Sequence, residues 1–73
     1  MYVYNIKYTN KTIQVECVEE EMSSKRLKNH ILMHIDKLSY DNLKLFMVED
    51  FNAFSLDDNE IVDFSQDFIL EVH

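Results

Sequence analysis

A chain of 73 residues that contains neither glycine nor proline excludes a phosphate-binding glycine loop, and with it most nucleotide-binding sites. Its 47% hydrophobic residues predict a packed core, and its length predicts a single domain, residues 1–73, that buries only about 60% of its extended surface. The net charge of −7 disfavours direct binding to nucleic acid or to anionic membranes.

The expected cellular compartment follows from cysteine usage and hydropathy. Cys17 is the single cysteine, so no disulfide can form within the chain, whereas small secreted domains usually carry several. No apolar run approaches the roughly 18 residues of a transmembrane helix, and the N-terminus lacks the pattern of a signal peptide. We therefore expect a soluble, cytoplasmic protein.

The N-terminal residues predict a β-hairpin. Apolar and polar side chains alternate over Tyr2–Tyr8 and again over Ile13–Cys17, which is the period of a strand with one buried face. Thr9–Lys11 provides the turn, with Asn10 as the residue that can adopt a left-handed conformation. The apolar face of the first strand consists of Tyr2, Tyr4, Ile6 and Tyr8.

An amphipathic helix is predicted over Ser23–Leu38. Its apolar residues recur at helical spacing, Ser23 and Ser24 can cap its N-terminus, and Lys37 falls in its last turn. The preceding acidic run, 19–21, is interpreted as a solvated connection near the positive end of the helix dipole. The predicted core face comprises Leu27, Ile31, Ile35 and Leu38.

The remaining residues predict further strands. Leu43–Val48 is apolar at nearly every position, as expected of a strand covered on both faces in the middle of a sheet. Residues 61–72 fit a strand or a helix equally by periodicity. The Phe, Ile and Val of Phe68–Val72 favour a strand there, preceded by a turn or short helix around Ser55–Asp63, where Ser55–Asp58 resembles a capping box.

Together these elements predict a small two-layer α+β domain. An antiparallel sheet of three to four strands, in the order β-β-α-β-β, is covered by one amphipathic helix. Exposed strand edges and Met33, on the helix face away from the core, favour association into a homodimer.

Candidate chemistry is sparse. His30 and His34 have the i, i+4 spacing of two metal ligands on one helix, and Cys17, Asp36 or His73 could complete a site if the fold brings them close. Cys17 is better explained as a small buried hydrophobe. No catalytic residue, cofactor or metal is predicted, because a core of this size leaves little room for a substrate pocket of about 300 Å³.

The acidic C-terminal part is the main functional feature. Residues 41–73 contain nine acidic residues and one basic residue, Lys44. On a helix, four of these acids would stand about 5–6 Å apart, comparable with phosphate spacing in DNA; on a strand, alternate members would be roughly 13 Å apart. The predicted partner-binding residues are Asp57, Asp58, Glu60, Asp63, Asp67 and Glu71.

These acids predict a non-enzymatic protein-binding module that binds a basic surface on a nucleic-acid-binding protein, in the manner of a DNA mimic. A phage or mobile-element inhibitor or regulator would be such a protein. Two alternatives remain open: a homo-oligomeric accessory protein whose acids serve solubility alone, and, less favoured, a metal-binding protein that uses His30 and His34.

Overall fold

The computed structural model describes residues 1–35 and 38–73, and these form seven strands, one α-helix and one 3₁₀ turn. The helix α1 spans Ser24–Leu32, and the 3₁₀ turn η1 spans Tyr40–Asn42. The strands are β1 (Tyr2–Tyr8), β2 (Lys11–Cys17), β3 (Glu21–Ser23), β4 (Leu43–Glu49), β5 (Asn52–Ser55), β6 (Ile61–Asp63) and β7 (Asp67–Val72).

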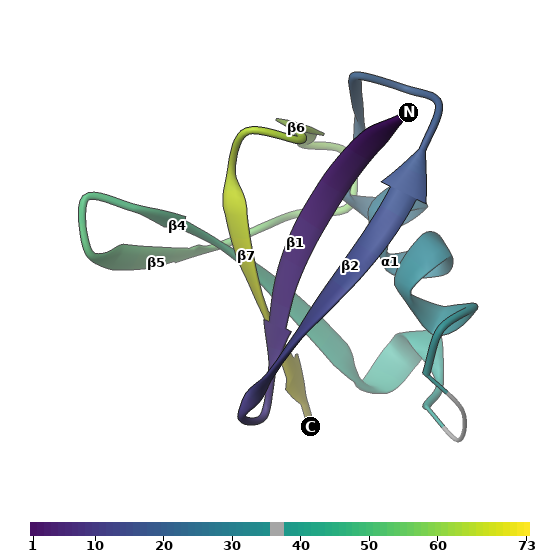
Figure 1. The fold of residues 1–73 in the computed structure, drawn as a ribbon. Coiled ribbons are helices and arrows are strands. Elements are labelled where there is room, and N and C mark those ends of the chain that lie inside the picture. Colours follow the sequence, from purple (N-terminus) through teal and green to yellow (C-terminus); the bar gives the residue numbers. More distant parts are fainter. Residues whose placement is uncertain (36–37) are drawn as a thin grey trace.

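Five strands form a mixed sheet in the order β2-β1-β7-β4-β5, and α1 packs against one face of it (Figure 1). The central strands β1 and β7 run parallel, and the other neighbouring strands are antiparallel. The strands β3 and β6 form a separate two-stranded ribbon at one end of the domain.

The α+β class is therefore confirmed, but the predicted antiparallel sheet of three to four strands is wrong in count, order and direction. Periodicity assigns side chains to faces and does not say which strands pair. Here the last strand inserts between β1 and β4, so that it pairs with the first strand of the chain. The short strands β3 and β6 are too brief to show any alternation.

The N-terminal hairpin is confirmed. Tyr4 pairs with Val15 and Ile6 with Ile13, and both Tyr4 and Ile6 are fully buried. The turn differs from the prediction, because Thr9 and not Asn10 has a positive φ, of 55°. Tyr8 pairs with Lys11, and a two-residue loop in such a hairpin needs a positive φ at its first position to match the strand twist.

The helix begins as predicted and ends earlier. Ser23 is its N-cap, and its hydroxyl accepts a hydrogen bond from the backbone N–H of Arg26 at 3.2 Å. The backbone N–H groups of Met33 and His34 bond to carbonyls three residues back, so a tightened turn closes the helix after Leu32.

The predicted core face of the helix extends beyond its end. Leu27 and Ile31 are fully buried on α1, whereas Ile35 and Leu38 lie outside the helix and still pack, partly buried, against the core. Asp36 and Lys37 lie outside the described residues, and so does the predicted position of Lys37 in a last helical turn.

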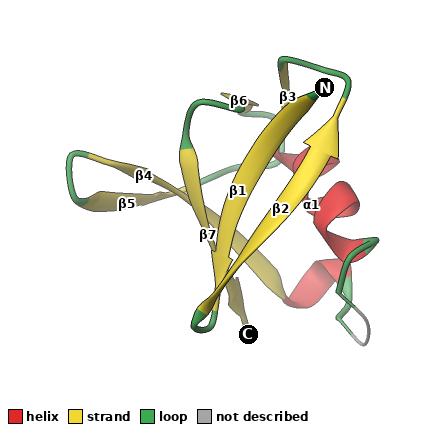
Figure 2. Cartoon of the chain, viewed as in Figure 1, coloured by secondary structure: helices red, strands yellow, loops and turns green. Residues whose placement is uncertain are grey.

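The strand predicted over Leu43–Val48 is confirmed as β4, with only one fully covered face. Leu43 and Leu45 are buried toward α1, Phe46 and Val48 are half-buried, and Lys44 is exposed. The helix covers one face of the sheet and leaves the opposite face open (Figure 2).

The ambiguous C-terminal third contains strands and turns. Phe68–Val72 is confirmed as part of β7, with Phe68 buried in the core. The segment 55–63 forms a turn followed by β6, and no helix, because its carbonyl groups serve another element. The backbone N–H of Ser24 donates to Glu60 at 2.8 Å and that of Lys25 to Asp58 at 3.1 Å, so this loop satisfies the free donors of the α1 N-terminus.

Candidate functional site

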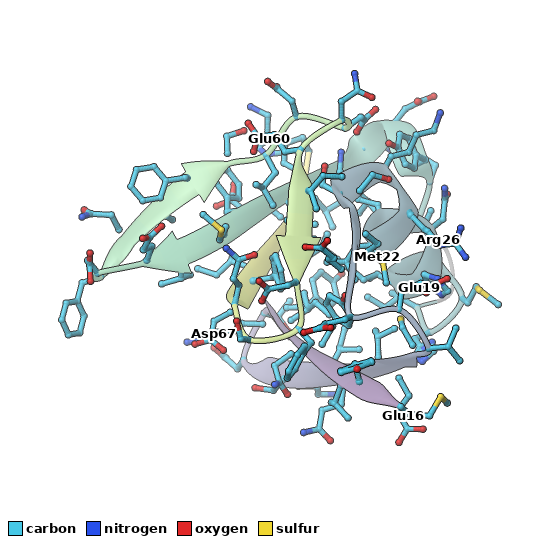
Figure 3. The ribbon with its side chains drawn as sticks, turned by 90° about the horizontal axis from the view of Figure 1, so that it is seen from above. Glu16, Glu19, Met22, Arg26, Glu60 and Asp67 are labelled. Carbon is cyan, nitrogen blue, oxygen red and sulfur yellow. The ribbon has the colours of Figure 1, made fainter. Side chains whose placement is uncertain are left out.

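Four of the six predicted partner-binding acids are exposed: Glu71, which is described below, and Asp57, Glu60 and Asp67. Asp57 and Glu60 lie in the loop between β5 and β6, and Asp67 is the first residue of β7. Figure 3 shows Glu60 and Asp67 on the upper side of the domain, which also carries the short ribbon β3–β6. The carboxylates of Asp57, Glu60 and Asp67 are available to a partner.

The other three predicted acids have partners within the chain. Asp58 binds the Lys28 ammonium at 3.1 Å, and Glu71 lies 3.3 Å from the His73 imidazole. Asp63 accepts hydrogen bonds from the backbone N–H and the hydroxyl of Ser65.

Of the two arrangements left open for these acids, the helical stripe with carboxylates about 5–6 Å apart does not form. Asp63 ends strand β6, whereas Asp67 begins strand β7 and Glu71 belongs to it, so these acids do not share one helix face. The β-strand preference of Phe68–Val72 prevails over the helical period that the acids also fit. Mimicry of DNA along one helix is therefore excluded for this segment.

Strand pairing instead brings a second acidic segment to the predicted one. Glu21 of β3 lies directly opposite Asp63 of β6, and the backbone N–H of Phe64 donates to the carbonyl of Glu20 at 3.3 Å. We call a set of acidic residues on β3 and β6 and near these strands in the sequence the acidic surface; they are Glu20, Glu21, Glu60, Asp63 and Asp67.

The acidic residues also affect the pKa of a neighbouring tyrosine. The pKa of Tyr4 is raised to about 12, first by burial of its hydroxyl, then by Cys17, and after that by nearby carboxylates that include Asp63 and Glu21. From the sequence alone, the run 19–21 is interpreted as a solvated connection near the positive end of the helix dipole. Its pairing with β6 could not be predicted, since both strands span three residues and join distant parts of the chain.

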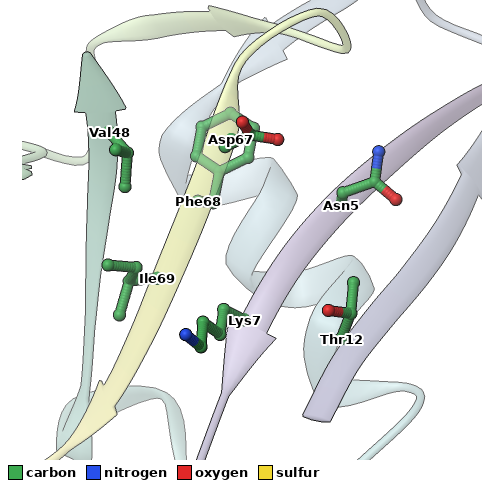
Figure 4. Close-up of a pocket in the computed structure, with 7 residues that line it drawn as sticks. All are labelled: Asn5, Lys7, Thr12, Val48, Asp67, Phe68 and Ile69. Carbon is green, nitrogen blue, oxygen red and sulfur yellow. The ribbon is translucent and has the colours of Figure 1, made fainter. Parts of the chain in front are cut away.

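The open face of the sheet contains a pocket of about 340 Å³ (Figure 4). Its lining comes from β1, β2, β4 and β7, with Lys7 and Asp67 as its charged residues. A pocket of this size was not expected in so small a domain; it forms on the face of the sheet that α1 leaves uncovered.

A different group of side chains meets between β2 and α1. Ligand atoms of Cys17, Glu19 and His30 lie within 4.8 Å of one another, with Cys17 buried and the other two half-buried. Burial raises the pKa of the Cys17 thiol, Glu19 raises it further, and Arg26 acts in the opposite direction.

The less favoured alternative, a metal site that uses both His30 and His34, is not the group that the structure brings together. The helix ends at Leu32, so His34 no longer follows His30 along one helical face. Among the described residues, the group that could hold a metal combines His30 with Cys17 and Glu19 and includes neither His34 nor His73. Asp36, the other candidate ligand, is not among these residues.

No family model matches the chain, and no curated protein or solved structure shows significant similarity to it. Within the described residues, no helix is long and apolar enough to cross a membrane. Because a topology alone does not define a function, function is inferred here from the side chains themselves.

Proposed function

We propose that the chain is a non-enzymatic protein-binding module whose acidic surface binds a basic surface of another protein. The observation that carries this proposal is the direct pairing of Glu21 with Asp63 across two strands. Like charges in directly opposed positions of an antiparallel pair destabilise a sheet. A small domain has little stability to lose, so an unfavourable pair in it points to a role outside folding.

The charge layout also favours a basic partner. A cluster of carboxylates attracts and orients a basic surface during diffusional encounter, and it repels nucleic acid. Opposed side chains such as Glu21 and Asp63 have Cβ atoms about 4.5–5.5 Å apart, which is close enough to occupy neighbouring phosphate sites of a nucleic-acid-binding protein. We therefore propose a phage or mobile-element inhibitor or regulator as the specific form, in which two paired strands present the charges.

A charge reversal tests this proposal. Glu21→Lys places a cation opposite Asp63, whereas the control Glu49→Lys makes the same change in charge on an exposed residue at the far end of β4. The partner is first captured from a bacterial lysate with the tagged protein, and its affinity for each variant is then measured at several salt concentrations. We expect Glu21→Lys to weaken binding about tenfold or more, because a loss of about 1.4 kcal/mol corresponds to tenfold.

Two results would contradict the proposal. One is an affinity that does not change with ionic strength, because a charge-driven interface is screened by salt. The other is an equal loss of affinity in both variants, because that result would show that only the net charge of the protein matters and not the position of Glu21. If double-stranded DNA fails to compete with the acidic protein for the partner, the DNA-mimic form is wrong and the general proposal remains.

Strand β5 favours a second candidate function, a homo-oligomeric accessory protein. All four residues of β5 are exposed and none is charged, whereas the opposite edge of the sheet, β2, carries Lys11 and Glu16. An uncharged free edge can pair with the same strand of a second copy. Phe51 and Phe54, both exposed, would add apolar area to that contact. A monomer by light scattering at all concentrations would exclude it.

A further inference from the structure

We propose that Cys17, Glu19 and His30 form a binding site for a divalent transition-metal ion, with zinc as the best fit. Their donor atoms are a thiolate sulfur, a carboxylate oxygen and an imidazole nitrogen, which are the three ligand types that zinc prefers. Hard cations such as magnesium and calcium select sites of oxygen alone. The mixture of donors therefore distinguishes this group from the acidic surface beside it.

The distances within the group suit a metal after a small adjustment. All three ligand atoms lie within 4.8 Å of one another. Zinc bonds of about 2.0–2.3 Å in a tetrahedron place ligand atoms about 3.3–3.8 Å apart. Glu19 and His30 are half-exposed, so rotation of their side chains can close the gap of roughly 1 Å, while the strand β2 holds Cys17 in place.

The backbone around Glu19 is fixed by a buried tyrosine. The hydroxyl of Tyr4 lies 2.8 Å from the carbonyl oxygen of Glu20 and 3.1 Å from that of Glu19, so it holds the connection between β2 and β3. Tyr4 is itself fully buried in the core. A ligand that is anchored in this way needs little ordering when the metal binds.

The side chain of Glu19 is oriented by Arg26, whose guanidinium lies 2.6 Å from one carboxylate oxygen (Figure 3). Ligating carboxylates commonly have such hydrogen-bond partners, which fix their direction. One oxygen can bind Arg26 while the other binds the metal. Three protein ligands leave a fourth position for water or for a side chain of a bound protein, as in open zinc sites.

Cobalt(II) titration of the full chain tests the site, since cobalt substitutes for zinc and reports its ligands by absorption. In metal-free buffer with a reductant that is not a thiol, we expect one cobalt per chain, a thiolate-to-cobalt charge-transfer band and the visible bands of tetrahedral cobalt. Zinc should displace the cobalt and raise the melting temperature, because an ion that binds only the folded state stabilises it.

Variants identify the ligands. Glu19 and His30 are partly exposed, so both positions should tolerate substitution. We expect His30→Ala and Glu19→Gln each to lower the affinity for cobalt about 10- to 100-fold. Cys17→Ser should remove the charge-transfer band. The matched control is His34→Ala, an exposed histidine outside the group, which should bind cobalt like the wild type.

Several outcomes would overturn the proposal: no charge-transfer band, a band with two chains per cobalt, or an unchanged affinity in His30→Ala. Loss of binding in His34→Ala would likewise contradict it, because that result would place the site at the wrong histidine. These readouts use purified protein and metal only. Failure of the metal site therefore leaves the protein-binding proposal untouched, and the reverse also holds.

Discussion

Phe51 at the tip of the β4–β5 hairpin combines strain with full exposure. Asp50 and Phe51 have φ values of 50° and 66°, as in a two-residue turn of type I′. Such turns favour Asn-Gly or Asp-Gly, and the left-handed conformation costs a residue with a Cβ atom about 1–2 kcal/mol. The side chain recovers none of this cost by burial, since Phe51 is fully exposed.

We expect Phe51→Gly to stabilise the protein. Relief of the backbone strain outweighs the extra flexibility that glycine gives to the unfolded chain, for a net gain of about 0.5–1 kcal/mol. In a domain of this size that raises the melting temperature by several degrees, measured by circular dichroism. The control Phe51→Ala keeps the Cβ atom and should give no gain. Equal gains in both variants would show that the aromatic ring, and not the backbone, is unfavourable.

The helix α1 and the loop after β5 act as one structural unit. The loop carbonyls accept from the first N–H groups of α1, and the Lys28 ammonium of α1 reaches back to the Asp58 carboxylate at 3.1 Å. Lys28 is buried, and its ammonium lies 5.0 Å from the centre of the Tyr40 ring. Two elements far apart in the sequence are therefore joined by a charged contact as well as by hydrogen bonds.

This contact predicts a pH dependence of stability. The pKa of Asp58 is lowered from 3.8 by the neighbouring Tyr40 hydroxyl and by Lys28. We attribute the effect mainly to Lys28, because the buried Tyr40 hydroxyl has no hydrogen-bond partner among the described residues. A carboxylate whose pKa is lower in the folded state stabilises it above pH 3.8, and this contribution disappears as the pH falls through the folded value.

Asp58→Asn should therefore be less stable than the wild type at neutral pH, and the difference should shrink toward zero in acid. Urea denaturation at a series of pH values measures it. Asp57→Asn, a change at the exposed neighbouring position, is the control and should show no such convergence. A wild-type advantage that persists in acid would mean that the aspartate side chain acts by shape and not by charge.

The sequence predicted which face of each element is buried better than it predicted which elements lie side by side. Alternation over Tyr2–Tyr8 and spacing over Leu27 and Ile31 identified buried residues, because burial leaves a local period. The exposed strand β5 and the three-residue strands leave no such period. The capping-box pattern at Ser55–Asp58 was misleading because the carbonyls of this loop cap α1, a contact between distant segments.

For the candidate sites, the sequence predicted residue types and missed their partners. The acids at 57–71 were identified, but their clustering with Glu21 depends on pairing of β3 with β6. Helical spacing paired His30 with His34, which lies outside the group; Cys17 had been named as a possible further ligand, whereas Glu19 had not. Sequence spacing can identify ligands that lie on one helix or strand, but it cannot identify ligands that come from three separate segments.

Over the whole molecule, the negative charge is confined to a small volume. The net charge is −7 and the radius of gyration is 11.1 Å. The Debye length is about 10 Å at 0.1 M salt, so at this or lower ionic strength most carboxylates interact with one another. Mutual repulsion among the carboxylates opposes the folded state, and the opposed pair Glu21 and Asp63 contributes to it.

Salt should therefore stabilise this protein. We expect the melting temperature to rise steadily from low salt to about 1 M sodium chloride, where the Debye length falls to about 3 Å. Screening also weakens the ion pair of Arg26 with Glu19, but exposed pairs contribute at most about 1 kcal/mol. Glu21→Lys should start with a higher melting temperature and respond less to salt, because it removes the repulsion from Asp63. A melting temperature that falls with added salt would show that ion pairs, and not repulsion among the carboxylates, dominate the electrostatic energy of the fold.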